Sequence, residues 1–467
     1  MKERNKRFKI PHTYVMLFSV MLIMAILTYI IPAGEFDRYH DEATDRTLVD
    51  SESFHQVERN PTKPFDLVKA VPKGMEESAQ IIFFIFIVGG SFQIITATGT
   101  IESGIGNLAK KLDGKEKIMI PVFVLIFSIG GFTFGMSEEV IVFVPIGIAL
   151  ARALGFDAIT GTAMISLGAA SGFSAAVMNP FTIGVAQGIA ELPLFSGAAL
   201  RIVVLIVMLI ITSIYIIRYG EKVKKDPSAS VVRDLEVEEK RKNIDINNLT
   251  TMTLKHKLIL LIVSLGFITL GIGVFKFDWY IVEIGSTFLA MGILSGLVGG
   301  LGPSKVAEEF VEGAKGIVFG ALVVGVARGI LVVMTEGMIM DTLVYSLSNL
   351  IKILPRSIAV FGMYIVQIII NFFIPSGSGQ AAVTMPIMTP LADLLGITRQ
   401  TAVLAFQFGD AFTNSIIPTS GSLMACLSIG NIPYEKWFKF IWPLMVIWLG
   451  VGGVFLVIAN AISYGPF

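Results

Sequence analysis

The chain has 467 residues, of which 54% are hydrophobic and 15% charged, with 36 basic and 36 acidic side chains. Average soluble domains carry about 25% charged residues. This charge deficit and the many long apolar runs indicate a polytopic membrane protein, which must be helical because lipid cannot satisfy backbone polar groups. The balanced charge gives no sign of a nucleic-acid partner. The single cysteine, Cys426, excludes an intramolecular disulfide and a cysteine-based metal site.

The first predicted helix covers residues 13–31. Its apolar stretch is too long for the core of a signal peptide and long enough to span a bilayer, so we expect it to be retained. Basic residues at positions 2, 4, 6, 7 and 9 precede it, which places the N-terminus in the cytoplasm. A polar segment, residues 35–73, then lies outside. A second helix, residues 78–98, returns to a basic loop at 110–117.

Residues 118–154 predict a helical hairpin. This stretch is apolar, but Gly130-Gly131 and the run Gly135-Met-Ser-Glu-Glu139 interrupt it. Each arm is only just long enough to span, or too short, so the simplest interpretation is a hairpin that enters the membrane and returns.

Residues 160–190 predict a broken helix, with interruptions at Ser171-Gly172 and Asn179-Pro180. A proline in an apolar run removes a backbone donor and clashes with the preceding turn, so it marks an unwound segment. Residues 200–217 form the next predicted helix.

A highly charged stretch, residues 218–257, predicts a cytoplasmic linker between two halves. The helix after it, residues 258–275, has no counterpart in the first half. This extra crossing turns the second half upside down. In that half, residues 281–301 match the first helix and residues 317–334 the second.

The second half contains its own predicted hairpin and broken helix. The hairpin covers residues 358–395, with its tip at Pro375-Ser-Gly-Ser-Gly-Gln380. The broken helix covers residues 401–429 and is interrupted around 413–415 and 418–421. The last predicted helix covers residues 438–462.

One stretch occurs twice in the chain. Residues 137–174 and 378–415 match at a constant offset of 241 positions (378 minus 137), as at Ser137/Ser378, Pro145/Pro386, Gly155/Gly396, Thr160/Thr401, Gly168/Gly409, Ala170/Ala411 and Ser174/Ser415. We therefore predict an all-α polytopic membrane protein with two inverted-topology repeats, residues 1–217 and 281–467. Each repeat carries a re-entrant helical hairpin and a broken transmembrane helix, which is an architecture of transporters.

The hairpin tips and helix breaks are the candidate substrate and ion site. Their backbone groups survive in a bilayer only where protein or a water-filled cavity surrounds them, and helix ends there bind charged groups. The candidate residues are Ser137, Glu138, Glu139, Asn179, Ser376, Gly377, Ser378, Gly379, Gln380, Thr413, Asn414 and Ser415. The alternative for a single serine or threonine is a hydrogen bond back to its own helix.

Ionisable residues inside the spans are few and expensive, so each is a functional candidate. Asp410 and Arg328 join the site on this ground, and Glu336 and Asp341 also lie in or near spans. Glu138 and Glu139 could instead be solvated at an interface, and Asp410 could be a structural partner of Arg328. The surplus of acids suits a proton, a sodium ion or a cationic substrate, whereas Arg328 could bind a substrate carboxylate.

The sequence shows no catalytic constellation. The four histidines have no metal-ligand spacing, and no glycine-rich segment ends in the Lys-Ser pattern of a phosphate-binding loop. We therefore expect that the protein is not an enzyme. We also expect it to hold no cofactor and no metal centre, apart from a possible sodium site near Thr413, Asn414 and Ser415. The coupling ion would be sodium or a proton.

Three segments resemble a known family: the opening PHTYVMLFSVMLIMAILTYIIPAGEFDR, the tip GMSEE, and INFFIPSGSGQAAVTMPIMTPLADLLGITRQTAVLAFQFGDAFTNSIIPTSG. They look like the four-carbon-dicarboxylate anaerobic carrier family, most closely its YfcC-like branch, often labelled basic amino acid (arginine/ornithine) antiporters. The wider ion-transporter superfamily uses inverted repeats and a mobile transport part, and the resemblance implies that the tips and breaks line the site. Superfamily likeness also implies a homodimer.

These observations predict a secondary active transporter of the bacterial inner membrane that works by alternating access. Amino acids are the favoured substrates, with arginine/ornithine exchange first. The alternative is a proton- or sodium-coupled carrier of dicarboxylates, short-chain carboxylates or peptides. An ion channel is a further alternative, because hairpins also occur in pores.

Overall fold

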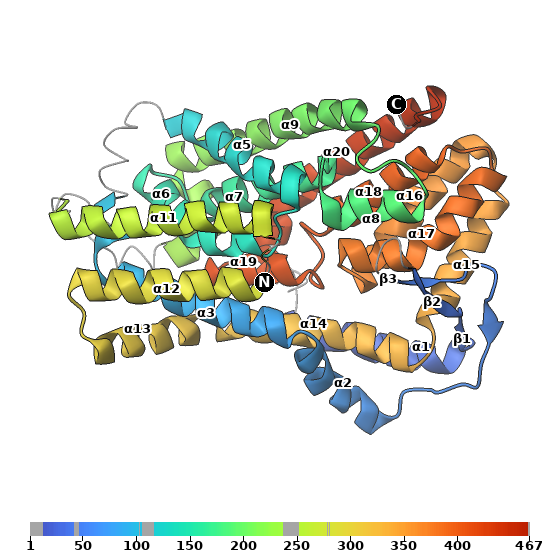
Figure 1. The fold of residues 1–467 in the computed structure, drawn as a ribbon, viewed down its shortest axis with the longest axis horizontal. Coiled ribbons are helices and arrows are strands. Elements are labelled where there is room, and N and C mark those ends of the chain that lie inside the picture. Colours follow the sequence, from blue (N-terminus) through green and yellow to red (C-terminus); the bar gives the residue numbers. More distant parts are fainter. Residues whose placement is uncertain are drawn as a thin grey trace, which may run out of the picture.

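The computed structural model describes residues 13–41, 46–101, 103–104, 116–236, 252–277, 279 and 281–465. The described chain is almost entirely helical, as predicted (Figure 1). The expected cytoplasmic N-terminus, the basic loop at 110–117 and most of the linker after Glu236 lie wholly or largely outside these residues.

The first half begins with α1 (Thr13–Ile30), followed by four short strands: β1 (Gly34–Glu35), β2 (Arg38–Asp41), β3 (Arg46–Val49) and β4 (His55–Gln56). β1 pairs with β4 and β2 with β3, both antiparallel. The remaining elements are α2 (Pro64–Glu77), α3 (Ala79–Ala97), α5 (Glu116–Phe134), the 3₁₀ turn η1 (Glu139–Phe143), α6 (Val144–Ala153), α7 (Ala158–Ala175), the π-helical turn η2 (Pro180–Gly184), α8 (Val185–Ile189) and α9 (Ala198–Lys225).

After a short 3₁₀ turn, η3 (Pro227–Ala229), and α11 (Leu254–Phe277), the second half contains α12 (Ile281–Gly299), α13 (Pro303–Gly316), α14 (Val318–Glu336), α15 (Met340–Lys352), α16 (Arg356–Phe373), α17 (Gly377–Leu394), α18 (Arg399–Thr413), α19 (Gly421–Ile429) and α20 (Tyr434–Ala461). α9 continues eight residues past the predicted start of the linker at 218, because apolar residues on one face still pack there: Gly220 and Val223 are buried.

The helices form two layers. The α3–α14 layer consists of α1, α2, α3, α11, α12, α13 and α14, and the α7–α18 layer of α5 to α9 and α16 to α20. In Figure 1 the first layer, apart from α11, occupies the lower part of the molecule, and the second layer occupies the upper part. Packing within the first layer is reciprocal, since α2 lies on α14 and α13 lies on α3.

Both halves contain a hairpin followed by a broken helix. α5 and α6 pack mainly against α7, and α16 and α17 pack mainly against α18. The two hairpins enter from opposite ends of the molecule and their tips meet near its middle (Figure 1). That an inversion relates the complete halves remains a prediction.

In the first half, glycines allow the backbones of α5 and α7 to approach each other closely. A Cβ at Gly172 of α7 would lie 2.0 Å from the carbonyl oxygen of Ser128 in α5, and one at Gly131 would lie 2.1 Å from that of Ala169. Small residues of this kind let helix backbones approach inside a membrane.

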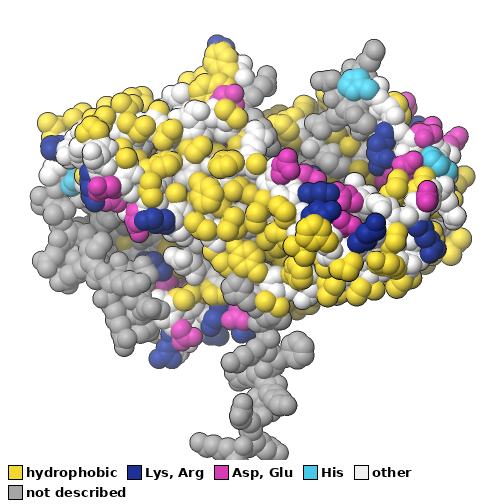
Figure 2. Space-filling view, turned by 90° about the horizontal axis from the view of Figure 1, so that it is seen from below, with side chains coloured by type: hydrophobic (Ala, Val, Ile, Leu, Met, Phe, Trp, Pro, Cys, Tyr) yellow, Lys and Arg dark blue, Asp and Glu magenta, His cyan; other side chains and the backbone are white. Residues whose placement is uncertain are grey.

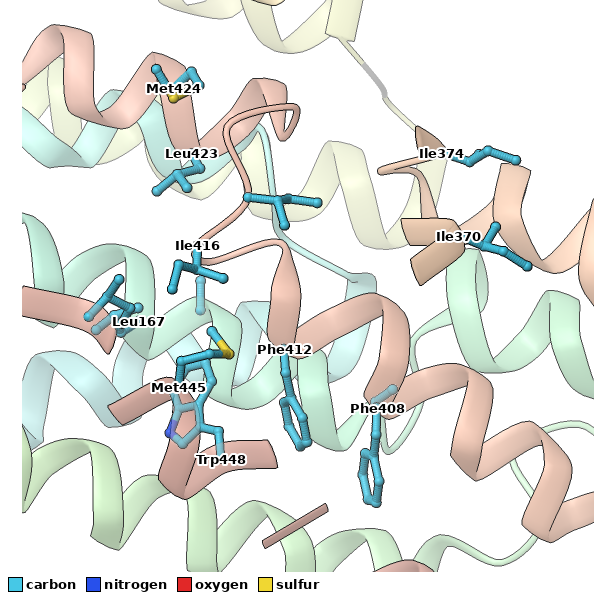
Figure 3. Close-up of a cluster of buried hydrophobic side chains, with 14 of the residues drawn as sticks. Leu167, Ile370, Ile374, Phe408, Phe412, Ile416, Leu423, Met424, Met445 and Trp448 are labelled. Atoms are coloured by element: carbon cyan, nitrogen blue, oxygen red, sulfur yellow. The ribbon is translucent and has the colours of Figure 1, made fainter. Parts of the chain in front are cut away.

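In the second half, aromatic side chains pack between α18 and α20. Phe408 and Phe412 of α18 stack with ring centroids 5.1 Å apart, and Trp448 of α20 lies 5.9 Å from Phe412. Figure 3 shows these rings beside Met445, with Leu167 of α7 nearby. This core holds α18 against α20 and α7.

Six helices in the described residues are long and apolar enough to cross a membrane, or seven if the bent pair α13–α14 is one span. Their outward faces carry exposed apolar side chains such as Phe83 and Val282. On the face formed by the α3–α14 layer, hydrophobic side chains cover the middle and charged ones gather mostly toward the two ends (Figure 2). This distribution matches a lipid-facing belt between two aqueous surfaces.

Candidate functional site

A cavity of about 240 Å³ lies where the two hairpin tips, the two helix breaks and the inner faces of α3 and α14 meet. It has room for several water molecules or a small organic solute. Eight of the fourteen predicted site residues line it: Ser137, Glu138, Glu139, Arg328, Ser376, Gly377, Ser378 and Asn414. The other six lie behind its wall or in the supporting helices.

The first tip is a tight turn between α5 and η1. Gly135 has φ = +72°, a conformation that other residues adopt at a cost, and a Cβ there would lie 2.5 Å from Oδ1 of Asn179. The Ser137 amide donates to Glu139 Oε2 at 3.0 Å, and its hydroxyl donates to Ser422 Oγ at 3.2 Å. The tip is thus tied to the second helix break while Glu138 and Glu139 line the cavity.

The second tip begins at Ser376, whose hydroxyl accepts from the Gly379 amide at 3.4 Å and so caps α17. A Cβ at Gly377 would lie 2.3 Å from Cγ2 of Thr182 and 3.2 Å from Oδ2 of Asp410. Only glycine therefore lets this tip approach both broken helices. Gln380 is buried and donates to the Gln367 side chain at 2.6 Å, so it holds α17 on α16 and does not line the cavity.

The two helix breaks have the same local geometry. Asn179 and Ser420, which are 241 positions apart like the other repeated residues, both have φ = −70° and ψ = 111°. Each caps the segment that follows: Asn179 Oδ1 accepts from the Phe181 amide, and Ser420 Oγ accepts from the Leu423 amide. The breaks therefore share a backbone shape and a capping role, whereas their side chains differ.

Asp410, Thr413 and Asn414 belong to one buried cluster around Asn371. The Asn371 amide nitrogen donates to Asp410 O at 2.8 Å, to Thr413 Oγ1 at 2.7 Å and to Asn414 Oδ1 at 3.0 Å. Asn414 donates to Asp410 Oδ1 at 3.4 Å. Asp410 Oδ2 has no hydrogen-bond partner among the described residues. Several oxygen atoms thus converge behind the second tip.

Ser415 lies on the other side of the break. Its carbonyl accepts from Trp437 Nε1 at 2.9 Å, and it lines a second, mostly apolar cavity of about 50 Å³ beside Cys426. The two cavities share the wall formed by Ser137, Phe173, Asn414 and Ser422.

Arg328 forms an ion pair with Glu77 of α2, with Nε and Oε2 2.7 Å apart. The alternative that Arg328 is the structural partner of Asp410 is therefore wrong. The other in-span acids lie away from the cavity: Glu336 pairs with Lys73, and Asp341 pairs with Arg38 at 2.9 Å. Which acid pairs with Arg328 depends on how α2 and α14 pack, and no local sequence pattern reveals this packing.

Sequence reasoning missed several cavity-lining residues. The polar ones are Ser78, Thr182, Thr419, Ser420 and Ser422, and the aromatic ones Phe173, Phe181 and Phe373. The run Pro418-Thr-Ser-Gly421 was recognised as a break, and its resemblance to Pro375-Ser-Gly at the second tip could have added its hydroxyls. Ser78 lies at the kink between α2 and α3 and gives no such signal.

The site offers hydroxyls, amides and carboxylates around a space for a solute. Within the described part of the chain, no group of three or more His, Cys, Asp or Glu residues could hold a metal ion. Hairpin tips and broken helices around a polar cavity, in a chain with several membrane-spanning helices, define a multi-pass membrane transporter.

The family model described as DcuC, C4-dicarboxylate anaerobic carrier, matches residues 10–461. The chain therefore belongs to this family. It is 34% identical, over 98% of both chains, to an Escherichia coli (strain K12) protein named "Putative basic amino acid antiporter YfcC". It is 29% identical, again over 98% of both chains, to an uncharacterized protein of Haemophilus influenzae (strain Rd). Among solved structures, the YdaH transporter of Alcanivorax borkumensis is similar with a TM-score of 0.43 and 14% identity, covering 98% of this chain and 100% of that one.

The family and its relatives agree with a secondary transporter in the bacterial inner membrane. The resemblance seen in the sequence is confirmed at the level of the family.

Proposed function

We propose that the protein is an antiporter of basic amino acids, with arginine/ornithine exchange as the first candidate, and that it works by alternating access. The observation that carries this proposal is the pair of acids, Glu138 and Glu139, in the wall of the cavity. Among the described residues, Arg328 is the one basic side chain that lines it, and it is already paired with Glu77. The name of the Escherichia coli relative supports the same substrate class.

A carboxylate can hold a guanidinium or ammonium group through charge-assisted hydrogen bonds. The hydroxyls and backbone amides of the second tip, around Ser376 and Ser378, would hold the α-carboxylate of the solute. The cavity would then bind both the positively charged side chain and the negatively charged carboxylate of a basic amino acid.

Counterflow of labelled arginine in proteoliposomes tests the proposal. We expect saturable exchange with arginine and ornithine, and a loss of about ten-fold or more in Glu138→Gln/Glu139→Gln, since a hydrogen bond to a charged group contributes about 1.5–3 kcal/mol. Glu336→Gln is the matched control, because that acid pairs with Lys73 away from the cavity, and it should exchange arginine as the wild type does.

Exchange of a dicarboxylate, short-chain carboxylate or peptide without arginine exchange would favour the alternative carrier, to which the family's name points. Unitary currents in planar bilayers without counterflow would favour a channel. Either result would end the proposal, and so would a membrane-bound chemical conversion of the solute.

We further propose that a sodium ion or a proton is the coupling ion and binds in the Asp410 cluster with Thr413 and Asn414. The buried, unpartnered Oδ2 of Asp410 supports this, because hard cations prefer several oxygen ligands. Ser415 supports it less, since its carbonyl is occupied by Trp437. We also propose a homodimer in the bilayer, which mass photometry in nanodiscs would test.

A further inference from the structure

Arg201 is a buried charge that the proposed transport site does not use. It is the fourth residue of α9, and its side chain is 1% exposed. No carboxylate lies within ion-pair distance of its guanidinium in the described part of the chain; its hydrogen bonds go to other groups. A buried charge without a counter-ion costs several kcal/mol unless hydrogen bonds satisfy it, and in a membrane such a residue marks a functional position.

The acceptors of Arg201 come from three separate parts of the chain. Nη1 donates to Ser196 O at 2.7 Å and to Tyr464 OH at 3.2 Å. Nη2 donates to Phe195 O at 3.0 Å and to Val177 O at 3.3 Å. The fixed fork of the guanidinium can serve such divergent carbonyls at once, which the point charge of lysine cannot.

The loop that contains Phe195 and Ser196 has other supports. Gln187 Oε1 accepts from the Phe195 amide at 2.6 Å, and Gln400 Nε2 donates to Ser196 O at 2.6 Å. Removal of Arg201 should therefore leave this loop in place. Val177 is different, because Arg201 supplies the hydrogen bond that its carbonyl oxygen makes in the structure.

Val177 lies in the unwound segment between α7 and η2. The segment starts at Ala176, which has φ = +44°, and ends at Asn179, which packs against Gly135 of the first tip. The next residues, Phe181 and Thr182, line the cavity. The carboxyl end of α7 also carries a partial negative charge that a cation stabilises. Arg201 is thus connected to the cavity wall indirectly, through the backbone of the unwound segment that it binds.

The second break is held by neutral donors. Trp437 Nε1 donates to Ser415 O at 2.9 Å, and Tyr434 OH donates to Ile416 O at 2.7 Å. The acid beside that break is Asp410. One break is therefore supported by a guanidinium and the other lies beside a carboxylate, although the capping residues of both share one backbone conformation.

We propose that Arg201 is a positioning residue for solute binding, which fixes the unwound segment of the first broken helix against the first hairpin tip. It touches neither the cavity nor the solute. Its effect passes through Val177 to the wall formed by Thr182 and Gly135. The part of the proposal that concerns solute affinity rests on the proposed amino acid exchange, and the part that concerns the segment does not.

Hydrogen–deuterium exchange of the detergent-purified protein tests the segment directly. In Arg201→Gln, amides of residues 176–184 should exchange about ten-fold faster, since ten-fold corresponds to the loss of one hydrogen bond of about 1.4 kcal/mol. Amides of residues 414–421 should not change and serve as the internal control. Tyr464→Phe is the matched variant, because it removes an Arg201 contact and leaves the bond to Val177.

Arg201→Lys covers the case in which the glutamine variant does not fold, and should show the same local acceleration in smaller degree. Unchanged exchange at 176–184, or equal acceleration at both breaks, would overturn the proposal. In the transport assay, we expect Arg201→Gln to raise the KM for arginine about ten-fold with Vmax within about two-fold, and Arg201→Lys to restore part of it. Wild-type protein that exchanges no arginine would end the proposed function, while the amide-exchange result would still decide the role of Arg201.

Discussion

One carboxylate oxygen of Asp410 lacks a hydrogen-bond partner among the described residues, although the side chain is fully buried. Leaving such an acceptor unmet costs about 1–3 kcal/mol. In the same cluster, the Asn371 amide nitrogen donates to Thr413 and Asn414, but its Oδ1 also has no partner among the described residues. Two buried oxygen atoms that lack a donor in one cluster, one of them on a carboxylate, are expected to serve binding.

We therefore expect Asp410→Asn to lower transport about ten-fold or more and to leave the melting temperature within a few degrees, because the amide keeps the shape and loses the charge. Ion-dependent uptake and thermal unfolding in detergent measure the two effects. Asp393→Asn is the control, since that acid pairs with Arg399 at the surface of α17. Normal kinetics in Asp410→Asn would remove this residue from the site.

Gly377 offers a sharper test at the same scale. We expect Gly377→Ala to lower transport strongly, since its Cβ would lie 2.3 Å from Thr182 Cγ2, and overpacking of this kind costs about 1–3 kcal/mol. Thr182→Ser removes that methyl group, so the double variant should recover part of the loss. Counterflow measured in the single and double variants gives the coupling energy between positions 377 and 182. Additive losses would show that the contact between the second tip and the first broken helix does not matter.

At the scale of single elements, α7 depends on its glycines. Gly168 and Gly172 are four residues apart and face α5, where a Cβ would lie 2.9 Å from Val124 Cα and 2.0 Å from Ser128 O respectively. The backbones could not stay at this distance with larger residues.

Gly172→Ala should therefore destabilise the protein by about 1–3 kcal/mol, because the added methyl group forces α5 and α7 apart. Thermal or denaturant unfolding in detergent checks it. Gly450→Ala in α20 is the matched control, since a Cβ there meets nothing within 4 Å. Equal stability of the two variants would contradict the proposed packing constraint.

The hairpins and breaks could be predicted because glycine, proline and polar residues interrupt apolar runs there. α2 and α13 could not, since sequences such as PFDLVKAVPKGMEE and PSKVAEEFVEGAKG carry many charges and resemble loops. They are amphipathic helices that lie on α14 and α3 and gain their stability from that contact. The strands β1 to β4 are too short for any periodicity to show.

At the scale of the whole molecule, the strand segment connects distant parts of the chain. β1 contacts α15 and β3 contacts α17. Both Asp341 oxygens lie 2.9 Å from Arg38 Nη2, and Oδ2 also accepts from the Phe36 amide at 3.1 Å. Asp341 was a candidate for function from the sequence, and the structure gives it this anchoring role.

We expect Asp341→Asn to raise amide exchange in residues 34–41 several-fold, since it weakens three hydrogen bonds to one carboxylate. Exchange in α18 should stay at the wild-type level. Asp37→Asn is the control, because Asp37 lies in the same segment and its amide donates to Ser53 rather than to a residue of α15. An unchanged strand segment would show that α15 does not hold it.

The wall that α14 contributes to the cavity comes from one stripe of a single helix: Val324, Ala327, Arg328 and Leu331. Positions spaced by three and four residues share one face. Changes along this stripe would alter the solute's surroundings without touching a hairpin tip or a break. Substrate selectivity can therefore change through one face of α14 alone, and exchanging these four residues between relatives is a direct test of what sets substrate preference.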